Sequence, residues 1–192
     1  MRVVAGTYKG RNLKTLKGDA TRPTTMRVKE SLFSSLTSLL GSFEGLVVLD
    51  AFAGSGGLGI EALSRGAAEV TFFERSRAAA GVVEDNLATI GAPSDAVTLK
   101  VGDTLRLAVR KQPHPFDLVF LDPPYAFDPA QVFDLIGSLD TQGSLSVRAL
   151  ICYELAKKNK AACYEQAHRV EWEIVASKDF GDTTYCIARK AI

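Results

Sequence analysis

From residue 46 onward, the chain alternates short apolar runs with segments of helical periodicity, and this alternation strongly restricts its possible folds. Strands that are apolar throughout are typical of a parallel sheet buried on both faces, and the helical segments between them supply the crossover connections. The sequence therefore predicts an α/β fold with a mostly parallel sheet and helices on both faces. The expected strands are 46–50, 70–74, 97–101, 117–122 and 150–154, with helices beginning near Gly57, Arg77, Thr104 and Pro129.

The N-terminal part follows a different pattern. Residues 2–5 and 11–14 are short extended pieces joined around Gly6 and Gly10, which predicts a small β-hairpin. Further on, apolar residues recur at helical spacing over 28–40 and predict one amphipathic helix.

At the C-terminal end, residues 170–175 and 183–189 alternate apolar and polar side chains. They predict an antiparallel pair that closes one edge of the sheet. We therefore divide the chain into a basic N-terminal hairpin extension, residues 1–25, and a main domain, residues 26–192.

Composition is that of a globular protein. The 192 residues suit one domain, 46% are apolar, 23% are charged, and no apolar stretch approaches the ~20 residues needed to cross a bilayer. The cysteines lack metal-ligand spacing, and the chain has only two histidines to join them. We expect a reduced, metal-free, cytoplasmic protein in which Cys152, Cys163 and Cys186 belong to the core.

Basic charge is concentrated at the start of the chain. Residues 1–30 carry eight Lys or Arg and two acidic residues, although the net charge of the whole chain is +1. Such clustering suits contact with a phosphate backbone, because affinity for a polyanion rises with the number of phosphates neutralised. The candidate contacts are Lys9, Arg11, Lys14 and Arg22; charge alone also allows a solvated arm without a partner.

A glycine-rich loop follows the first expected strand, with glycines at 54, 56 and 59 in the segment 50–61. Glycines let the backbone turn tightly and approach a ligand, and the helix that begins there offers unpaired N–H groups. The segment predicts a nucleotide-like ligand, although a tight turn without a ligand has the same pattern.

Acidic residues lie at the ends of the first three expected strands or just after them. Glu74 lies about 20 residues after the first glycine, where an acid accepts hydrogen bonds from ribose hydroxyls. A nicotinamide cofactor would explain this spacing equally well, but Asp50 suits an amine-bearing ligand better than a pyrophosphate. Asp103 is placed to accept from an adenine amino group, or to cap a helix.

The segment Asp122-Pro123-Pro124-Tyr125 directly follows an apolar strand. Two prolines fix the backbone and cannot continue a helix or a ladder, so the segment is expected to form a stiff corner that presents backbone carbonyls. Acceptors beside an aromatic ring suit a planar group that carries an NH2, such as a nucleobase. An ordinary tight turn is the alternative.

Together these motifs resemble class I S-adenosylmethionine-dependent methyltransferases, in which Asp-Pro-Pro-Tyr marks enzymes that methylate exocyclic amino groups. Segments 6–13, 22–25, 27–33 and 180–183 are further similar to the bacterial 16S ribosomal RNA guanine-N2 methyltransferase family, and the resemblance covers nearly the whole chain. One departure is Met26, where the family is expected to have aspartate. The helix that starts there would then take its cap from Thr24 or Thr25.

The resemblance implies a seven-stranded Rossmann-like sheet, S-adenosylmethionine as cofactor, and 16S ribosomal RNA or the small ribosomal subunit as partner of a monomeric enzyme. Thr24 and Thr25 would lie near the methionine carboxylate, Glu74 would hold the ribose and Asp103 the adenine. By resemblance the cofactor contacts are Thr24, Thr25, Asp50, Phe52, Ala53, Gly54, Ser55, Gly56, Glu74, Arg75, Asp103 and Thr104, and the catalytic corner is Asp122, Pro123, Pro124 and Tyr125.

Other functions remain open on the residues alone. A DNA adenine-N6 methyltransferase can share the same corner and cofactor, but usually needs an inserted recognition domain for which this chain has no room. A protein glutamine methyltransferase would favour Asn at position 122. A nicotinamide-dependent oxidoreductase or a non-catalytic nucleotide-binding protein would explain the glycine loop without the corner.

Overall fold

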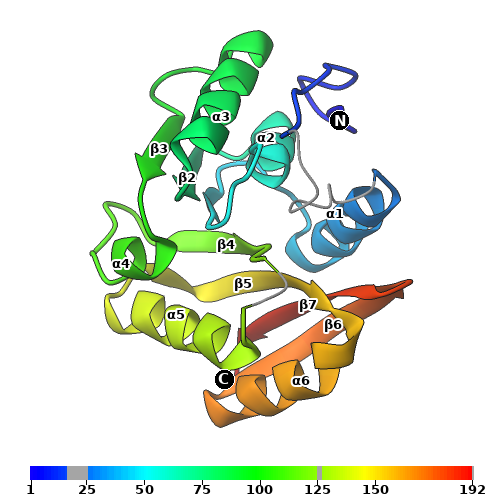
Figure 1. The fold of residues 1–192 in the computed structure, drawn as a ribbon, viewed down its shortest axis with the longest axis vertical. Helices are drawn as coiled ribbons and strands as arrows, with labels where there is room; N and C mark the ends of the chain where they lie inside the picture. The colour runs from blue at the N-terminus through cyan, green and yellow to red at the C-terminus, as the bar shows by residue number, and fades with distance from the viewer. Residues whose placement is uncertain (17–25, 125–126, 192) are drawn as a thin grey trace.

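A seven-stranded sheet forms the centre of the computed structural model, which describes residues 1–16, 26–124 and 127–191. The strands lie in the order β3-β2-β1-β4-β5-β7-β6 (Figure 1). Their bounds are β1 Val47–Asp50, β2 Glu69–Glu74, β3 Val97–Val101, β4 Phe116–Leu121, β5 Leu145–Ala156, β6 Trp172–Phe180 and β7 Thr183–Lys190.

Strands β1 to β5 pair in parallel, and β7 pairs antiparallel with both β5 and β6. This confirms the predicted mostly parallel sheet and its antiparallel C-terminal pair. Strands follow the chain outward in one direction from β1 to β3 and in the other from β4 onward, so the strand order reverses between β1 and β4. In open α/β sheets a crevice forms at such a switch point, outside the carboxyl ends of the strands.

Helices cover both faces of the sheet (Figure 1). Helices α1, α2 and α3 contribute to one buried apolar cluster, and α4, α5 and α6 to the other. The helical elements are α1 Met26–Leu40, α2 Gly57–Ser64, α3 Arg77–Ile90, α4 Thr104–Ala108, α5 Pro129–Thr141, the short 3₁₀ turn η1 Lys157–Asn159 and α6 Lys160–Arg169.

The middle of each central strand is apolar because successive side chains enter different clusters. On β4, Leu118 and Phe120 pack with the α1–α3 layer, whereas Val119 and Leu121 pack with the α4–α6 layer. Successive side chains of a strand point to opposite faces, so a sheet covered twice needs apolar residues at every position.

Three elements differ most from the prediction. Strand β5 begins at Leu145, five positions before the expected start, β6 ends at Phe180, five positions after the expected end, and helix α6 was not predicted. In α6 only Cys163 and Ala167 are buried, so its apolar stripe is too narrow to give a helical pattern. The buried positions of Cys152, Cys163 and Cys186 confirm that the three cysteines belong to the core.

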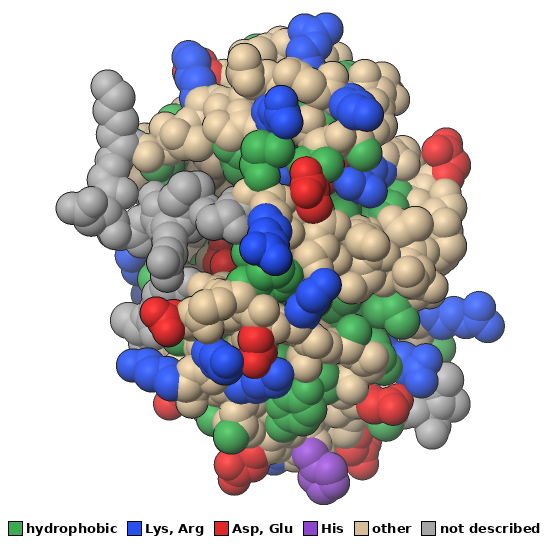
Figure 2. All heavy atoms as spheres, turned by 90° about the vertical axis from the view of Figure 1, so that its right-hand side faces the viewer, with side chains coloured by type: hydrophobic (Ala, Val, Ile, Leu, Met, Phe, Trp, Pro, Cys, Tyr) green, Lys and Arg blue, Asp and Glu red, His purple; other side chains and the backbone are tan. Residues whose placement is uncertain are grey.

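The described part of the N-terminal extension, residues 1–16, runs across the end of the molecule beside α2 (Figure 1). It folds back on itself through one antiparallel bridge, Arg2 with Asn12, rather than through two full strands. Val3 and Leu13 enter the core cluster of the α1–α3 layer. Figure 2 faces the side that carries this extension, and Lys and Arg side chains outnumber acidic ones in its upper half.

Close backbone contact joins the extension to α2. The Thr7 amide donates to the Ser64 carbonyl oxygen at 2.7 Å, and the Tyr8 amide donates to Ser64 Oγ at 2.9 Å. Gly6 has a φ of +83°, and a Cβ atom there would lie 1.7 Å from the Ser64 carbonyl oxygen. Only glycine permits this approach.

The buried carboxylate of Glu61 on α2 forms a second connection. Its oxygens accept from the amides of Val4 at 2.8 Å and Ala5 at 3.0 Å, and pair with Lys29 Nζ and Arg65 Nε, both at 3.0 Å. Lys29 is therefore buried, with 1% of its surface exposed, and does not add to the basic surface that the sequence suggested. The division of the chain at residue 25 stays a prediction.

Candidate functional site

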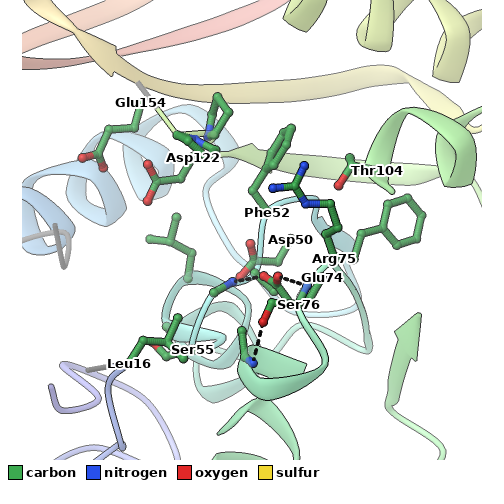
Figure 3. A pocket seen from close by; sticks show the side chains of 18 of the residues that line it. Leu16, Asp50, Phe52, Ser55, Glu74, Arg75, Ser76, Thr104, Asp122 and Glu154 are labelled. Carbon is green, nitrogen blue, oxygen red and sulfur yellow. Dashed lines mark hydrogen bonds between the residues drawn. The ribbon is translucent and has the colours of Figure 1, made fainter. Parts of the chain in front are cut away.

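A cavity of about 330 Å³ opens at the carboxyl ends of β1, β2 and β4, at the switch point of the sheet (Figure 3). Residues from the glycine loop, from the ends of these strands and from the N-terminal extension line it. Its size lies within the range of about 300 to 1,000 Å³ that is typical of small-molecule sites.

The glycine loop forms the wall between β1 and α2. Gly54 and Gly56 have φ values of +55° and +79°, a backbone region that side chains disfavour. Gly59 has a different role, because a Cβ there would lie 2.4 Å from Phe72 Cε1 of β2. Two glycines thus permit the turn, and the third permits close packing of the helix on the sheet.

Asp50 ends β1 beneath this loop and is 2% exposed. Its Oδ2 accepts a hydrogen bond from the Gly59 amide at 2.9 Å. Burial raises the pKa of the Asp50 carboxyl to about 7, the Gly59 hydrogen bond opposes this, and the Glu74 charge adds to it. A buried acid that loses its proton near neutral pH suits a ligand carrying a positive charge.

Replacing Asp50 by asparagine is expected to stabilise the ligand-free protein at pH 8. Because the folded-state pKa, about 7, exceeds the ordinary value of 3.8, ionisation of Asp50 costs the wild type stability as pH rises through this range. Asparagine keeps an acceptor for Gly59 but does not ionise. Urea unfolding should show an advantage on the order of 4 kcal/mol at pH 8 that almost vanishes near pH 4.

The control is the same change at exposed Asp95, which should leave stability unchanged at both pH values. An advantage of the Asp50 variant that persisted undiminished at pH 4 would show that ionisation is not its cause.

Glu74 ends β2 and stabilises the loop from the other side of the cavity. Its Oε2 accepts from the Gly54 amide at 2.8 Å and its Oε1 from the Ser76 amide at 2.7 Å, as Figure 3 shows. A carboxylate has about four acceptor positions, so these two bonds leave room for two more donors from a ligand. Glu74 therefore holds the loop in shape and also faces the cavity.

Asp103 and Thr104 lie at the start of α4. Asp103 Oδ1 accepts from the Arg106 amide at 3.2 Å, so Asp103 is the helix cap that the sequence allowed, and it also lines the cavity. The Thr104 hydroxyl donates to the Ala51 carbonyl oxygen at 2.7 Å and fixes α4 against the end of β1. Both residues position this wall of the cavity.

The proline corner leaves β4 directly after Leu121. Asp122 is half-buried, Pro123 is buried and Pro124 is exposed, and all three line the same cavity as Asp50 and Glu74. Tyr125 lies outside the described residues. The corner and the glycine loop, which are far apart in sequence, thus share one cavity.

Most of the predicted cofactor contacts lie on this cavity. Gly56 is the turn residue behind it, and Thr24, Thr25 and Arg22 lie outside the described residues. Lys9, Arg11 and Lys14 are exposed on the extension, away from the lining. The predicted residues that line the cavity are Asp50, Phe52, Ala53, Gly54, Ser55, Glu74, Arg75, Asp103, Thr104, Asp122, Pro123 and Pro124.

Several lining residues were not predicted from the sequence, and three of them matter to the chemistry of the cavity. Glu154 lies on β5, where Tyr153 pairs with Leu121, and Figure 3 shows its carboxylate beside that of Asp122. Phe127 packs edge-to-face on Phe52, with ring centroids 5.4 Å apart. An acid near the end of a strand was the signal that found Glu74, and it would have found Glu154 as well. Lys29, the third, lies three, four and seven residues before Leu32, Phe33 and Leu36, so helical spacing alone places it on the apolar face of α1.

Within the described ranges, no group of three or more His, Cys, Asp or Glu side chains is arranged to hold a metal ion. In the same residues, no helix combines the length and the apolar character needed to cross a membrane.

Comparison with known proteins matches the family model described as conserved hypothetical protein 95 to residues 1–189. Ribosomal RNA small subunit methyltransferase D of Haemophilus influenzae is 37% identical over 186 residues, which cover 96% of this chain and 91% of that protein. The protein of the same name from Escherichia coli K12 is 38% identical over 159 residues, 83% of this chain and 76% of that one. The solved structure of YhhF, a candidate methyltransferase of Escherichia coli, has a TM-score of 0.81 at 30% identity and covers 100% of this chain and 98% of its own.

Proposed function

Because this chain belongs to the family of the ribosomal RNA small subunit methyltransferase D proteins and shares their class I methyltransferase fold, we propose that it methylates one guanine of 16S ribosomal RNA. The methyl donor is S-adenosylmethionine, and the acceptor is the exocyclic N2 amino group of that guanine. One observation carries the proposal: the Asp122–Pro124 corner, which suits an NH2 group, opens into the same cavity as Asp50 and Glu74.

The residues of the cavity fit S-adenosylmethionine. Asp50 suits the ammonium group of its methionine part, Glu74 has acceptor positions left for the ribose hydroxyls, and Asp103 has an acceptor for the adenine amino group. A Cβ at Gly54 would meet no atom within 4 Å, so this part of the loop is open to a ligand. When bound, the cofactor supplies an electrophilic methyl group on a sulfonium.

The protein's own part in the reaction is to align and activate the amine. Guanine N2 is a weak nucleophile because its lone pair is delocalised into the ring. The Asp122 carboxylate and the Pro123 carbonyl would accept hydrogen bonds from the two N–H groups of guanine N2 and favour a pyramidal nitrogen. These bonds stabilise the transition state more than the ground state. Asp122 or water takes the proton after alkylation, when the nitrogen has become acidic.

The target base has to leave its stack to reach this corner. Tyr125 would stack on the extruded base, a contact worth on the order of 1 to 3 kcal/mol. The corner would then hold the base by its edge and by its face.

The direct test incubates the protein with tritiated S-adenosylmethionine and small ribosomal subunits, or bare 16S ribosomal RNA, from a strain that lacks the activity. We expect label on N2 of a single guanine after nuclease digestion. Label on adenine N6, or label in DNA instead of RNA, would show that the acceptor is an adenine amino group and not guanine N2.

We propose that the N-terminal extension contacts RNA phosphates. Lys9, Arg11 and Lys14 are exposed, and Lys14 Nζ forms a solvent-exposed ion pair with Asp85 at 2.8 Å. Such a pair contributes little to stability, so phosphate can replace its partner at small cost. Phosphate contacts of this kind give affinity and register without reading the sequence.

Replacing Lys9, Arg11 and Lys14 together by alanine is expected to weaken RNA binding and to reduce its dependence on salt. Removal of one phosphate-binding cation lowers the slope of log affinity against log salt by about 0.7 to 0.9. Filter binding from low to high salt measures this slope. The matched control removes three exposed cations near the amino ends of β4 and β5, Arg110, Lys111 and Arg148, and should keep the wild-type slope. Equal slopes in all three proteins would exclude the extension from the RNA interface.

A further inference from the structure

Lys29 of α1 is a buried cation on the wall of the cavity. It is 1% exposed and is one of the residues that line the site. Its Nζ donates to the Arg2 carbonyl oxygen at 3.0 Å and pairs with Glu61 Oε2 at 3.0 Å. A lysine ammonium has three N–H donors, so these contacts leave one donor for a third acceptor.

The ion-pair cluster around Lys29 has more positive than negative charge. Among the described residues Glu61 is its single carboxylate, and it faces the two cations Lys29 and Arg65. Its two oxygens already accept from the Val4 and Ala5 amides as well, so the four acceptor positions of Glu61 are filled. Burial lowers the pKa of the Lys29 ammonium, Glu61 raises it, Arg65 lowers it again, and Glu30 makes a smaller raising contribution.

An excess buried charge is costly unless an opposite charge compensates it. Arg65 keeps 18% of its side chain exposed to solvent, and its Cζ lies over the Phe33 ring, 4.8 Å from the ring centroid. Within the described part of the chain, Lys29 has neither solvent nor an aromatic face as an alternative. The cavity is therefore where a compensating anion would be most favourable.

Two further features of the cavity point to the same kind of group. Gly57 and Leu58, the first residues of α2, line it, and the cap residue Gly56 gives no side-chain acceptor to this helix. The positive end of the helix dipole thus adds to the Lys29 charge. On another wall, Asp50 supplies a buried acid. One cavity with a buried base and a buried acid is complementary to a zwitterion.

We propose that Lys29 binds the carboxylate of the methionine part of the cofactor, while Asp50 faces its ammonium group. This assignment rests on the proposed use of S-adenosylmethionine and makes Lys29 a cofactor-binding residue as well as the partner of Glu61. A bound carboxylate occupies the third donor of Lys29 and balances the charge of its cluster.

The test compares two ligands that differ only in the carboxylate, S-adenosylhomocysteine and its decarboxylated form, by isothermal calorimetry on the full chain. The wild type should bind S-adenosylhomocysteine at least ~10-fold more tightly, the lower end expected for a charge-assisted hydrogen bond. In Lys29→Met this preference should fall to about twofold or less, because the variant loses affinity for S-adenosylhomocysteine but keeps its affinity for the decarboxylated ligand.

Arg65→Met is the matched control, because it removes the other cation from Glu61 but does not line the cavity. It should keep the wild-type preference even if it lowers stability. If Lys29→Met does not fold, the double variant Lys29→Met with Glu61→Leu removes the charge left behind and is expected to show the same loss of preference.

The possible outcomes distinguish the role of Lys29 from the use of S-adenosylmethionine as cofactor. A wild type that binds both ligands equally, or a Lys29→Met variant that keeps the full preference, overturns the role of Lys29 and leaves the proposed function intact. A wild type that binds neither ligand overturns the proposed cofactor itself.

Discussion

Replacing Asp122 by alanine is expected to lower the rate of methyl transfer by at least ~100-fold, the usual loss when one preorganised transition-state group is removed. Asp122 leaves the end of β4 beside buried Pro123, so its carboxylate is carried on a rigid corner of the cavity. The loss should fall on the chemical step, because Asp122 is expected to contact the amine and not the cofactor. Single-turnover kinetics with saturating RNA measures that step directly.

Two measurements make this prediction specific. Calorimetry should show nearly unchanged affinity of the Asp122→Ala variant for S-adenosylhomocysteine. The control Asp103→Ala alters the acid of the same cavity that is proposed to hold the adenine, and should weaken cofactor binding while the single-turnover rate at saturation stays within a few fold. Wild-type turnover in Asp122→Ala would refute the assignment of the corner.

Replacing Glu61 by alanine is expected to reduce the free energy of unfolding by about 3 to 5 kcal/mol, the usual cost of removing one partner from a buried ion pair. Glu61 is 0% exposed, and without it the ammonium of Lys29 and the amides of Val4 and Ala5 lose their acceptor together. For a domain with a stability of about 5 to 15 kcal/mol this is a large fraction. Urea unfolding followed by circular dichroism measures the change.

Glu69→Ala is the control for Glu61→Ala. Glu69 Oε2 forms a hydrogen bond with His114 Nδ1 at 2.9 Å, but the Glu69 side chain is 41% exposed, so its removal should change stability by less than about 1 kcal/mol. A Glu61→Ala variant that is as stable as Glu69→Ala would mean that water reaches the Lys29 cluster and replaces the carboxylate.

Much of the site was predictable from the sequence because its signals are local. The glycine loop, Glu74, Asp103 and Asp122 each directly follow or end an apolar run, and the carboxyl ends of parallel strands meet at one edge of a sheet. A linear pattern therefore carried three-dimensional information. Strand β3 was predicted with its observed bounds for the same reason.

The part that could not be predicted depends on contacts between residues far apart in sequence. Lys29 has the helical spacing of the apolar face of α1 but the charge of a surface residue, and the partner that permits its burial, Glu61, lies 32 positions later. Helix α6 carries too few apolar residues to show its buried side. The predicted hairpin was partly right for a similar reason: residues 1–16 fold back on themselves, but much of their hydrogen bonding goes to α2 and α3 instead of across a ladder.

The hydrogen bonds of Asn86 on α3 predict that the extension unfolds together with the core. This fully buried amide accepts from the Lys14 amide at 2.7 Å and donates to the Lys14 carbonyl at 3.1 Å and to the Ser55 carbonyl of the glycine loop at 2.8 Å. Local unfolding of residues 1–16 would leave buried polar atoms of Asn86, Glu61 and Ser64 without their hydrogen-bond partners at the same time. We therefore expect the extension to belong to the same cooperative unit as the core. A truncation that removes this segment should destabilise the protein as much as a substitution in the core does. Hydrogen exchange at the amides of Val3 and Leu13 should be as slow as in the central strands.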